Sequence, residues 1–291
     1  MLGFAALGNL LQSYGEGIRY VCGGIATFLL ILVLLKLIMF PEMIKEDFKN
    51  PILASVAATF PMALMLLSTY IKPFIGVGAK YIWYFAIGLH IILIVYFTIK
   101  FLLKLQMPKV FASYFIVYVG IAVAAVTAPA FEELAIGAGA FWFGFLTLIG
   151  LLVLVTIRYM KYKEIPEPAK PLFCIYAAPT SLCVAGYVQS VTPKSREFLL
   201  AMLLVATMLY VLALVKAISY LKLKFYPSYA AFTFPFVISA IATKQTMVCL
   251  ANMKQPIPML RYVVLIETVI AVLFMIYTFI RFLQFIFADH K

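Results

Sequence analysis

The sequence predicts an all-α integral membrane protein, a single transmembrane domain over residues 1–291 with ten transmembrane helices, the first of them truncated. Hydrophobic residues make up 66% of the chain and charged residues 12%, whereas soluble domains carry about 45–50% and about 25%. Long runs without charge recur along the whole length, and the 23 Lys and Arg residues, against 11 acidic ones, lie mostly between those runs. A nucleic-acid binder would gather its basic residues on a polar surface, so that class is excluded.

Nine apolar runs are long enough to cross a membrane. A spanning helix needs about 20 apolar residues, within a range of roughly 17–25. Six of the runs have no charged residue, and three carry one ionisable interruption, which is Lys36, His90 or Glu267. The nine runs are 20–40, 52–71, 81–99, 110–131, 134–157, 171–193, 198–215, 225–243 and 262–280. They do not alternate polar and apolar residues, which excludes β-barrel strands.

Residues 1–11 are apolar but too short to span alone. They correspond to about 16 Å of helix against a hydrocarbon core of about 30 Å. A signal peptide would have a basic n-region, and none is present. Such a run is either a short interfacial helix or the second half of a helix whose first half is absent. We favour the second interpretation, through a start site assigned too late or a fragment. Counted as the first span, it brings the total to ten.

Basic residues between the spans predict the orientation of the chain. Fifteen of the 23 lie at the side reached by the even-numbered spans, among them Lys291, and eight lie at the other, among them Lys194 and Lys244. Cytoplasmic loops carry an excess of Lys and Arg. Both termini are therefore expected in the cytoplasm, and the protein in the plasma membrane.

A proline pattern separates odd from even spans. Four odd spans open with a proline, which suits the first turn of a helix: Pro51, Pro108, Pro171 and Pro227. Three of them carry a second proline 8 to 10 residues further on, and the other has a glycine: Pro61, Pro179, Pro235 and Gly120. Even spans have no internal proline. At roughly 12–15 Å depth the three prolines predict kinks near the membrane midplane. Packing alone explains a single proline, but the repeat favours five helical hairpins around a central pore of five kinked helices.

The residue types on the odd spans favour anions. Small and hydroxyl residues, including Ser181, Thr233 and Ser239, lie near the breaks, and no carboxylate lies within the membrane core of these helices. Cation pathways usually contain acidic residues, and a net charge of +12 with Lys244 near the outer end of the ninth span attracts anions. Small residues also serve close helix packing. No metal, cofactor or nucleophile motif is found, so neither an enzyme nor a cofactor is expected.

Two phenylalanines, Phe60 and Phe234, directly precede midplane prolines. A bulky ring at a kink can close a narrow pore, although packing against lipid or helices explains many of the 26 Phe residues equally well. His90 and Glu267 lie on even helices, where polar contacts between hairpins or subunits are favoured over ligand binding.

Three segments resemble the tellurite-resistance/dicarboxylate transporter family, which includes bacterial TehA, fungal malate permeases and plant slow-type anion channels. They are KPLFCIYAAPTSLCVAGY at 170–187, YPSYAAFTFPFVISAIAT at 226–243, and SYF-x-x-YVG within 108–120. The resemblance covers nearly the whole chain. It implies five quasi-repeated hairpins around a pore, a homotrimer with one pore per subunit, and an occluding phenylalanine in the ninth helix that matches Phe234. Residues 3–10 resemble the later half of the family's first pore helix.

The predicted function is a plasma-membrane channel or transporter for small anions, inorganic or C4-dicarboxylate, that works in the lipid bilayer and is gated by Phe234. One alternative is a proton-coupled exporter of C4-dicarboxylates or tellurite in which Glu267 or His90 titrates. Another is a membrane receptor or scaffold that keeps the fold without a pathway.

Overall fold

The computed structural model describes residues 1–288, in which helices are joined by short turns and loops and no strand is present. Nine helical stretches in this part are long and apolar enough to span a membrane. They are Glu16–Met39, Pro51–Ile75, Gly78–Leu102, Tyr114–Phe131, Leu134–Lys161, Glu167–Ser190, Arg196–Tyr220, Pro227–Asn252 and Leu260–Phe287. The predicted all-α membrane fold is confirmed. Lys291, counted above among the cytoplasmic basic residues, lies outside the described residues.

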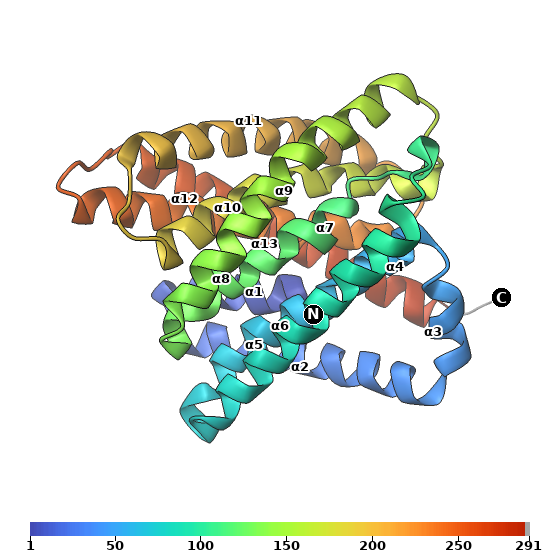
Figure 1. Ribbon diagram of the computed structural model, residues 1–291, viewed down its shortest axis with the longest axis horizontal. Coiled ribbons are helices and arrows are strands. Elements are labelled where there is room, and N and C mark those ends of the chain that lie inside the picture. The colour runs from blue at the N-terminus through green and yellow to red at the C-terminus, as the bar shows by residue number, and fades with distance from the viewer. Residues whose placement is uncertain (289–291) are drawn as a thin grey trace.

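The first helix, α1 (Leu2–Leu11), has ten residues. In Figure 1 it extends from the middle of the bundle to one end, beside the longer helices. A short 3₁₀ turn, η1 (Gln12–Tyr14), leads into α2 (Glu16–Met39). Helix α1 is nearly all buried although it is short, with seven of its ten residues inside the protein. It therefore occupies an inner position, as the sequence predicts for the first span.

Five continuous helices form the outside of the bundle. Besides α2 they are α6 (Gly78–Phe97), α9 (Leu134–Lys161), α11 (Arg196–Tyr220) and α13 (Leu260–Phe287). Only 17–39% of the most apolar stretch of these five spans is buried inside the protein, whereas the four spans between them are 56–94% buried. The exposed side chains are mainly Leu, Ile, Val, Phe and Met, which suit contact with lipid. The predicted division into inner and outer helices is therefore present.

Each of the four remaining inner spans is divided into segments. The third span has α4 (Pro51–Ala57) and α5 (Thr59–Ile75), and the fifth has α7 (Tyr114–Tyr118), η4 (Val119–Ile121), α8 (Ala122–Thr127) and η5 (Ala128–Phe131). The seventh has η6 (Glu167–Ala177) and α10 (Ala178–Ser190), and the ninth has η7 (Pro227–Phe232) and α12 (Phe234–Asn252). The segments η6 and η7 are 3₁₀ helices, which the hydropathy of the sequence did not predict.

The inner segments close into a ring. Helix α1 packs against α5, α5 against α8, α8 against α10, α10 against α12, and α12 against α1. Each also packs against the outer helix that follows it, in the pairs α1–α2, α5–α6, α8–α9, α10–α11 and α12–α13. Five hairpins therefore surround a common axis, and the inner helix of each hairpin faces it.

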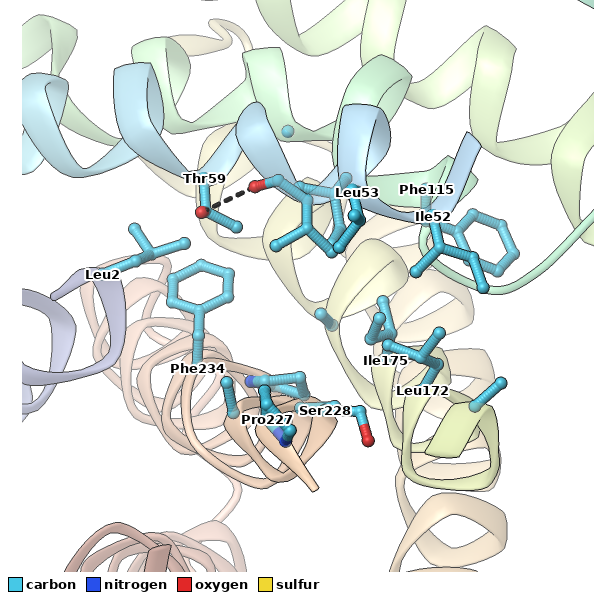
Figure 2. A pocket seen from close by; sticks show the side chains of 18 of the residues that line it. Leu2, Ile52, Leu53, Thr59, Phe115, Leu172, Ile175, Pro227, Ser228 and Phe234 are labelled. Carbon is cyan, nitrogen blue, oxygen red and sulfur yellow. Dashed lines mark hydrogen bonds between the residues drawn. The ribbon is translucent and has the colours of Figure 1, made fainter. Parts of the chain in front are cut away.

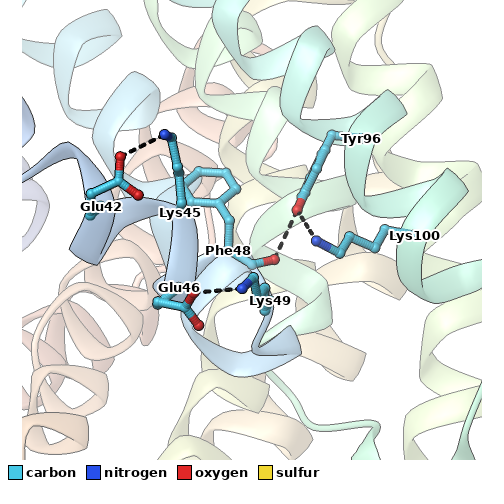
Figure 3. Close-up of polar contacts among 7 residues, drawn as sticks. All are labelled: Glu42, Lys45, Glu46, Phe48, Lys49, Tyr96 and Lys100. Atoms are coloured by element: carbon cyan, nitrogen blue, oxygen red, sulfur yellow. Dashed lines mark hydrogen bonds and ion pairs between the residues drawn. The ribbon is translucent and has the colours of Figure 1, made fainter.

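A polar connection joins the first two hairpins. Helix α3 (Pro41–Asp47) carries the ion pair of Lys45 with Glu42, and its Glu46 pairs with Lys49 just after the helix. Figure 3 shows how the chain after α3 is fixed to α6, because the Tyr96 hydroxyl donates to the Phe48 carbonyl over 2.8 Å. Asn50 then caps α4, because its side-chain oxygen accepts from the backbone N–H groups of Ile52 and Leu53 in the first turn of that helix.

Candidate functional site: two cavities that share Phe234

The first of two cavities along the axis, here called the apolar cavity, has a volume of about 480 Å³. Its walls are mainly Leu, Ile, Val, Ala, Pro and Phe side chains. Figure 2 shows Ile52, Leu53, Leu172 and Ile175 directed into this space from two inner spans. Its polar lining residues are uncharged, namely Asn50, Thr59, Tyr226 and Ser228. An ion in this cavity meets no fixed charge on the described residues that line it.

The second cavity, here called the lysine cavity, has a volume of about 890 Å³. Two ammonium groups, those of Lys194 and Lys244, are among its lining residues. Five carboxamides line it as well, from Asn9, Gln12, Gln189, Gln245 and Asn252. Among the described residues, neither cavity has an Asp or Glu in its lining.

Both cavities are built by the inner ring. Their described lining residues come from α1, the divided inner spans and the loops beside them, and none comes from the five outer helices. Phe234 and Leu182 belong to the walls of both cavities. The two residues therefore stand where the apolar cavity ends and the lysine cavity begins.

The Phe234 ring is placed by a backbone break. Thr233 leaves helical geometry with φ −95° and ψ −91°, between the 3₁₀ helix η7 and the first residue of α12. In Figure 2 the ring extends from α12 into the apolar cavity, with Leu2 and Thr59 nearby. The side chain is 8% exposed. The ring at the first residue of α12 can therefore separate the two spaces.

Three of the predicted kink residues begin new helices. Pro179 and Pro235 are each the second residue of α10 and α12, and Pro61 is the third residue of α5. Proline lacks an N–H and its ring collides with the preceding turn. The first turn of a helix tolerates both effects, so the chain ends one helix and starts another instead of bending a continuous one. Pro179 and Pro235 line the apolar cavity, and Pro61 is buried.

The fourth break is at Gly120 in the 3₁₀ segment η4, and it also lines the apolar cavity. A Cβ at this position would lie 2.7 Å from Met62 Sδ and 3.0 Å from His90 Cε1. His90 is completely buried, and its Nε2 lies 2.9 Å from the Val117 carbonyl oxygen, just before the break. Glycine allows the imidazole of an outer helix to reach this carbonyl.

The predicted hydroxyl residues lie at the breaks but not in the described cavity linings. The hydroxyl oxygens of Ser181 and Ser239 are 3.0 Å apart, and both donate to the Ala177 carbonyl, over 2.8 and 3.0 Å. They join α10 to α12 and satisfy a carbonyl at the end of η6. The Thr233 hydroxyl donates to the Ala230 carbonyl over 2.7 Å, and this side chain lies against α1 at Gly3. These three residues therefore stabilise the backbone at the breaks without lining either cavity.

Lys244 is held at the end of α1. Its Nζ donates to the Leu10 carbonyl over 2.9 Å and to the Ser13 hydroxyl over 2.6 Å. The last carbonyls of a helix have no partner within the helix, and the helix dipole favours a cation there. No carboxylate among residues 1–288 forms an ion pair with this lysine.

Sequence reasoning missed Leu182 and the lining role of Leu2. Leu182 follows Pro179 by three residues and so stands on the same helical face, which is the signal that could have found it. Leu2 belongs to an apolar run in which no residue stands out. Glu267, which the sequence singled out, is 3% exposed on α13 and has no place in the described cavity walls. No cluster of three possible metal ligands occurs within residues 1–288.

Comparison with known families agrees with this architecture. A family model described as voltage-dependent anion channel matches residues 1–283, which is nearly the whole chain. No curated protein matches it.

Proposed function

The chain belongs to the voltage-dependent anion channel family, and from this premise we propose that it conducts small anions through the two cavities, with Phe234 as the gate. Membership of the family makes it a multi-pass membrane protein of the anion channel and transporter type. Gating by Phe234 rests on one observation above all, that this ring belongs to the walls of both cavities. An apolar constriction between two wider spaces is a known means of closing a pore.

The charges along the path support anions as the conducted species. Lys194 and Lys244 line one cavity, the other is uncharged, and neither described lining contains a carboxylate. A passing anion is attracted by the two lysines in the lysine cavity and meets no charged lining residue in the apolar cavity on the other side of Phe234. The interaction is therefore weak along much of the path, which suits rapid passage more than tight binding.

We further propose that the apolar cavity opens to the cytoplasm and the lysine cavity to the outside of the plasma membrane. The segments beside the apolar cavity include α3 and the loops before η6 and η7, where basic residues are frequent. Under the positive-inside rule this places both termini in the cytoplasm. A homotrimer with one pore per subunit follows from the family resemblance of the sequence.

The gate is tested by removing the ring. Phe234→Ala should raise anion flux into liposomes by roughly tenfold or more, since this requires a barrier lower by only about 1.4 kcal/mol. Leu182→Ala, at the same boundary, should give a smaller increase. Phe60→Ala is the matched control, because Phe60 also precedes a proline but has no place in the described cavity walls. Equal flux in folded Phe234→Ala and wild-type protein would contradict the gate.

A proton-coupled exporter of C4-dicarboxylates or tellurite is the second candidate, favoured by one observation. The Glu267 carboxyl is 3% exposed inside the membrane span, and its Oε2 finds no hydrogen-bond partner among the described residues. A buried ionisable group within a membrane protein is expensive and often functional. Flux that follows the pH gradient in wild type and loses this dependence in Glu267→Gln would support the exporter. Flux that changes neither with the pH gradient nor with Glu267→Gln would exclude the exporter.

A further inference from the structure

We propose that the lysine cavity is a binding site for polyatomic oxyanions, in which Lys194 and Lys244 supply the charge and the surrounding carboxamides supply N–H donors. The chemical class is a carboxylate or inorganic oxyanion, larger than a halide. The inference rests on the proposed function, since it assigns the step at which the conducted anion is first held.

The two ammonium groups differ in how they are held. Lys244 is fixed by the Leu10 carbonyl and the Ser13 hydroxyl at 2.9 and 2.6 Å. An ammonium has three N–H donors, so one remains after these two bonds. Lys194 forms no hydrogen bond and no ion pair with the rest of residues 1–288, and it is only partly exposed. Both groups therefore retain donors and charge for a ligand.

The carboxamides add directional donors. The Asn9 side-chain oxygen accepts from Arg19 Nε over 3.2 Å, so the amide N–H₂ of Asn9 points away from that guanidinium. Gln245, next to Lys244 in the chain, has a buried side-chain oxygen without a partner among the described residues. That oxygen accepts hydrogen bonds and needs a water or another donor, so only the N–H₂ group of the same amide can serve an oxyanion.

Acidic residues do not cancel this charge. Gln12 donates to the Glu16 carboxylate over 2.7 Å, and this contact is exposed. Beside the two lining lysines lies Arg19, which donates to the lining residue Asn9 and whose guanidinium also lies 4.5 Å from the centre of the Tyr70 ring. The cavity is therefore cationic on balance.

The geometry of the donors selects the ligand class. Hydrogen bonds from charged donors to oxygen are directional and about twice as strong as neutral ones. An oxyanion presents several acceptor oxygens and can bond to an ammonium and to amides at once. A halide is a single acceptor and gains little from donors spread around a cavity of about 890 Å³.

The contribution of the two lysine charges is tested by measuring current through membrane patches that contain the open Phe234→Ala protein. The nitrate concentration is varied on one side of the membrane at a time. Current should saturate with nitrate on the lysine-cavity face, and Lys194→Gln and Lys244→Gln should each raise the half-saturating concentration by roughly tenfold. Lys194→Gln is decisive, because Lys194 forms no hydrogen bond or ion pair within residues 1–288 and its substitution therefore removes no contact that stabilises the fold. Lys254→Gln is the matched control, since Lys254 is exposed at the same end but does not line the cavity. Half-saturation unchanged in Lys194→Gln and Lys244→Gln would overturn the site.

The ligand class is tested with nitrate, acetate and chloride in Gln189→Leu. Half-saturation should rise for nitrate and acetate and stay near the starting value for chloride. An equal rise for all three anions would overturn the assignment to oxyanions, because it would leave a general effect on charge or shape.

Binding is also measured without conduction, so that failure of the site and failure of the channel can be told apart. Nitrate should raise the thermal unfolding temperature of the purified wild-type protein. The rise should be absent in Lys194→Gln and kept in Lys254→Gln. This stabilisation without any current in Phe234→Ala would overturn conduction and leave the site standing. Current without stabilisation would overturn the site alone.

Discussion

The apolar cavity and the lysine cavity share Phe234 and Leu182, yet they offer an anion opposite surroundings. One is a smaller space of about 480 Å³ with aliphatic walls, and the other is about 890 Å³ with ammonium and carboxamide groups. A charge loses hydration energy when it enters an apolar space. In the proposed pathway, attraction and resistance are therefore separated: the lysine cavity would concentrate anions, and the apolar cavity would disfavour them.

Two threonines of one helix allow a matched comparison of the cavities. Thr59 lines the apolar cavity and Thr69 the lysine cavity. Both belong to α5, and each hydroxyl donates over 2.7 Å to the carbonyl three residues earlier. The same substitution therefore compares the two surroundings on one helix, with Thr59 at its first residue and Thr69 in its interior.

A carboxylate in the apolar cavity should give the largest effect. In the open Phe234→Ala background, Thr59→Asp should lower anion current by roughly three orders of magnitude, since like charges about 4 Å apart repel by about 4 kcal/mol at an effective dielectric constant of about 20. Thr69→Asp should lower it only a few fold, because Lys194 and Lys244 compensate. The loss should grow as the pH rises and the new carboxyl ionises. Thr59→Asn and Thr69→Asn are the uncharged controls, and equal losses in both aspartates would refute the contrast.

The proline and hydropathy pattern was sufficient to predict the inner and outer helices, because lipid contact and burial depend on residue type averaged over a span. It was not sufficient to place individual side chains. Ser181 and Ser239 were expected at the pore or kink, but they bond to each other and to Ala177 between α10 and α12. The faces that meet across two helices depend on where each helix restarts, and the 3₁₀ geometry of η6 changes that phase.

The packing behind the apolar cavity should give the next largest effect. Gly120→Ala places a Cβ against Met62 and His90, and overpacking of this kind costs about 1–3 kcal/mol. We expect a lower unfolding temperature by differential scanning fluorimetry. Gly139→Ala on the exposed face of α9 has open space around its new Cβ, and it should be neutral or stabilising by up to about 1 kcal/mol. An unfolding temperature of Gly120→Ala equal to that of wild type would contradict the prediction, because it would show that Met62 and His90 move aside without cost.

The smallest effect should come from the ion pair outside the membrane at the lysine-cavity end. Glu133 lies between η5, whose Ala130 lines that cavity, and α9. One of its oxygens is 2.5 Å from Lys80 Nζ and accepts from the Tyr84 hydroxyl over 2.5 Å. Hydrogen bonds from Lys80 and Tyr84 hold the pKa of Glu133 below its ordinary value of 4.5.

A pKa lowered in the folded protein means that the stabilisation is complete above the ordinary value and is lost as the pH falls through the lower, native one. The unfolding temperature of Glu133→Gln should therefore lie slightly below that of wild type at pH 7, and the two should converge in acid. The difference should be small and decrease with salt, because the pair is partly exposed. Glu132→Gln, at the exposed neighbouring position, should show no such convergence. If Glu133→Gln and wild type keep a constant difference across the pH range, the pair does not stabilise this wall through its charge.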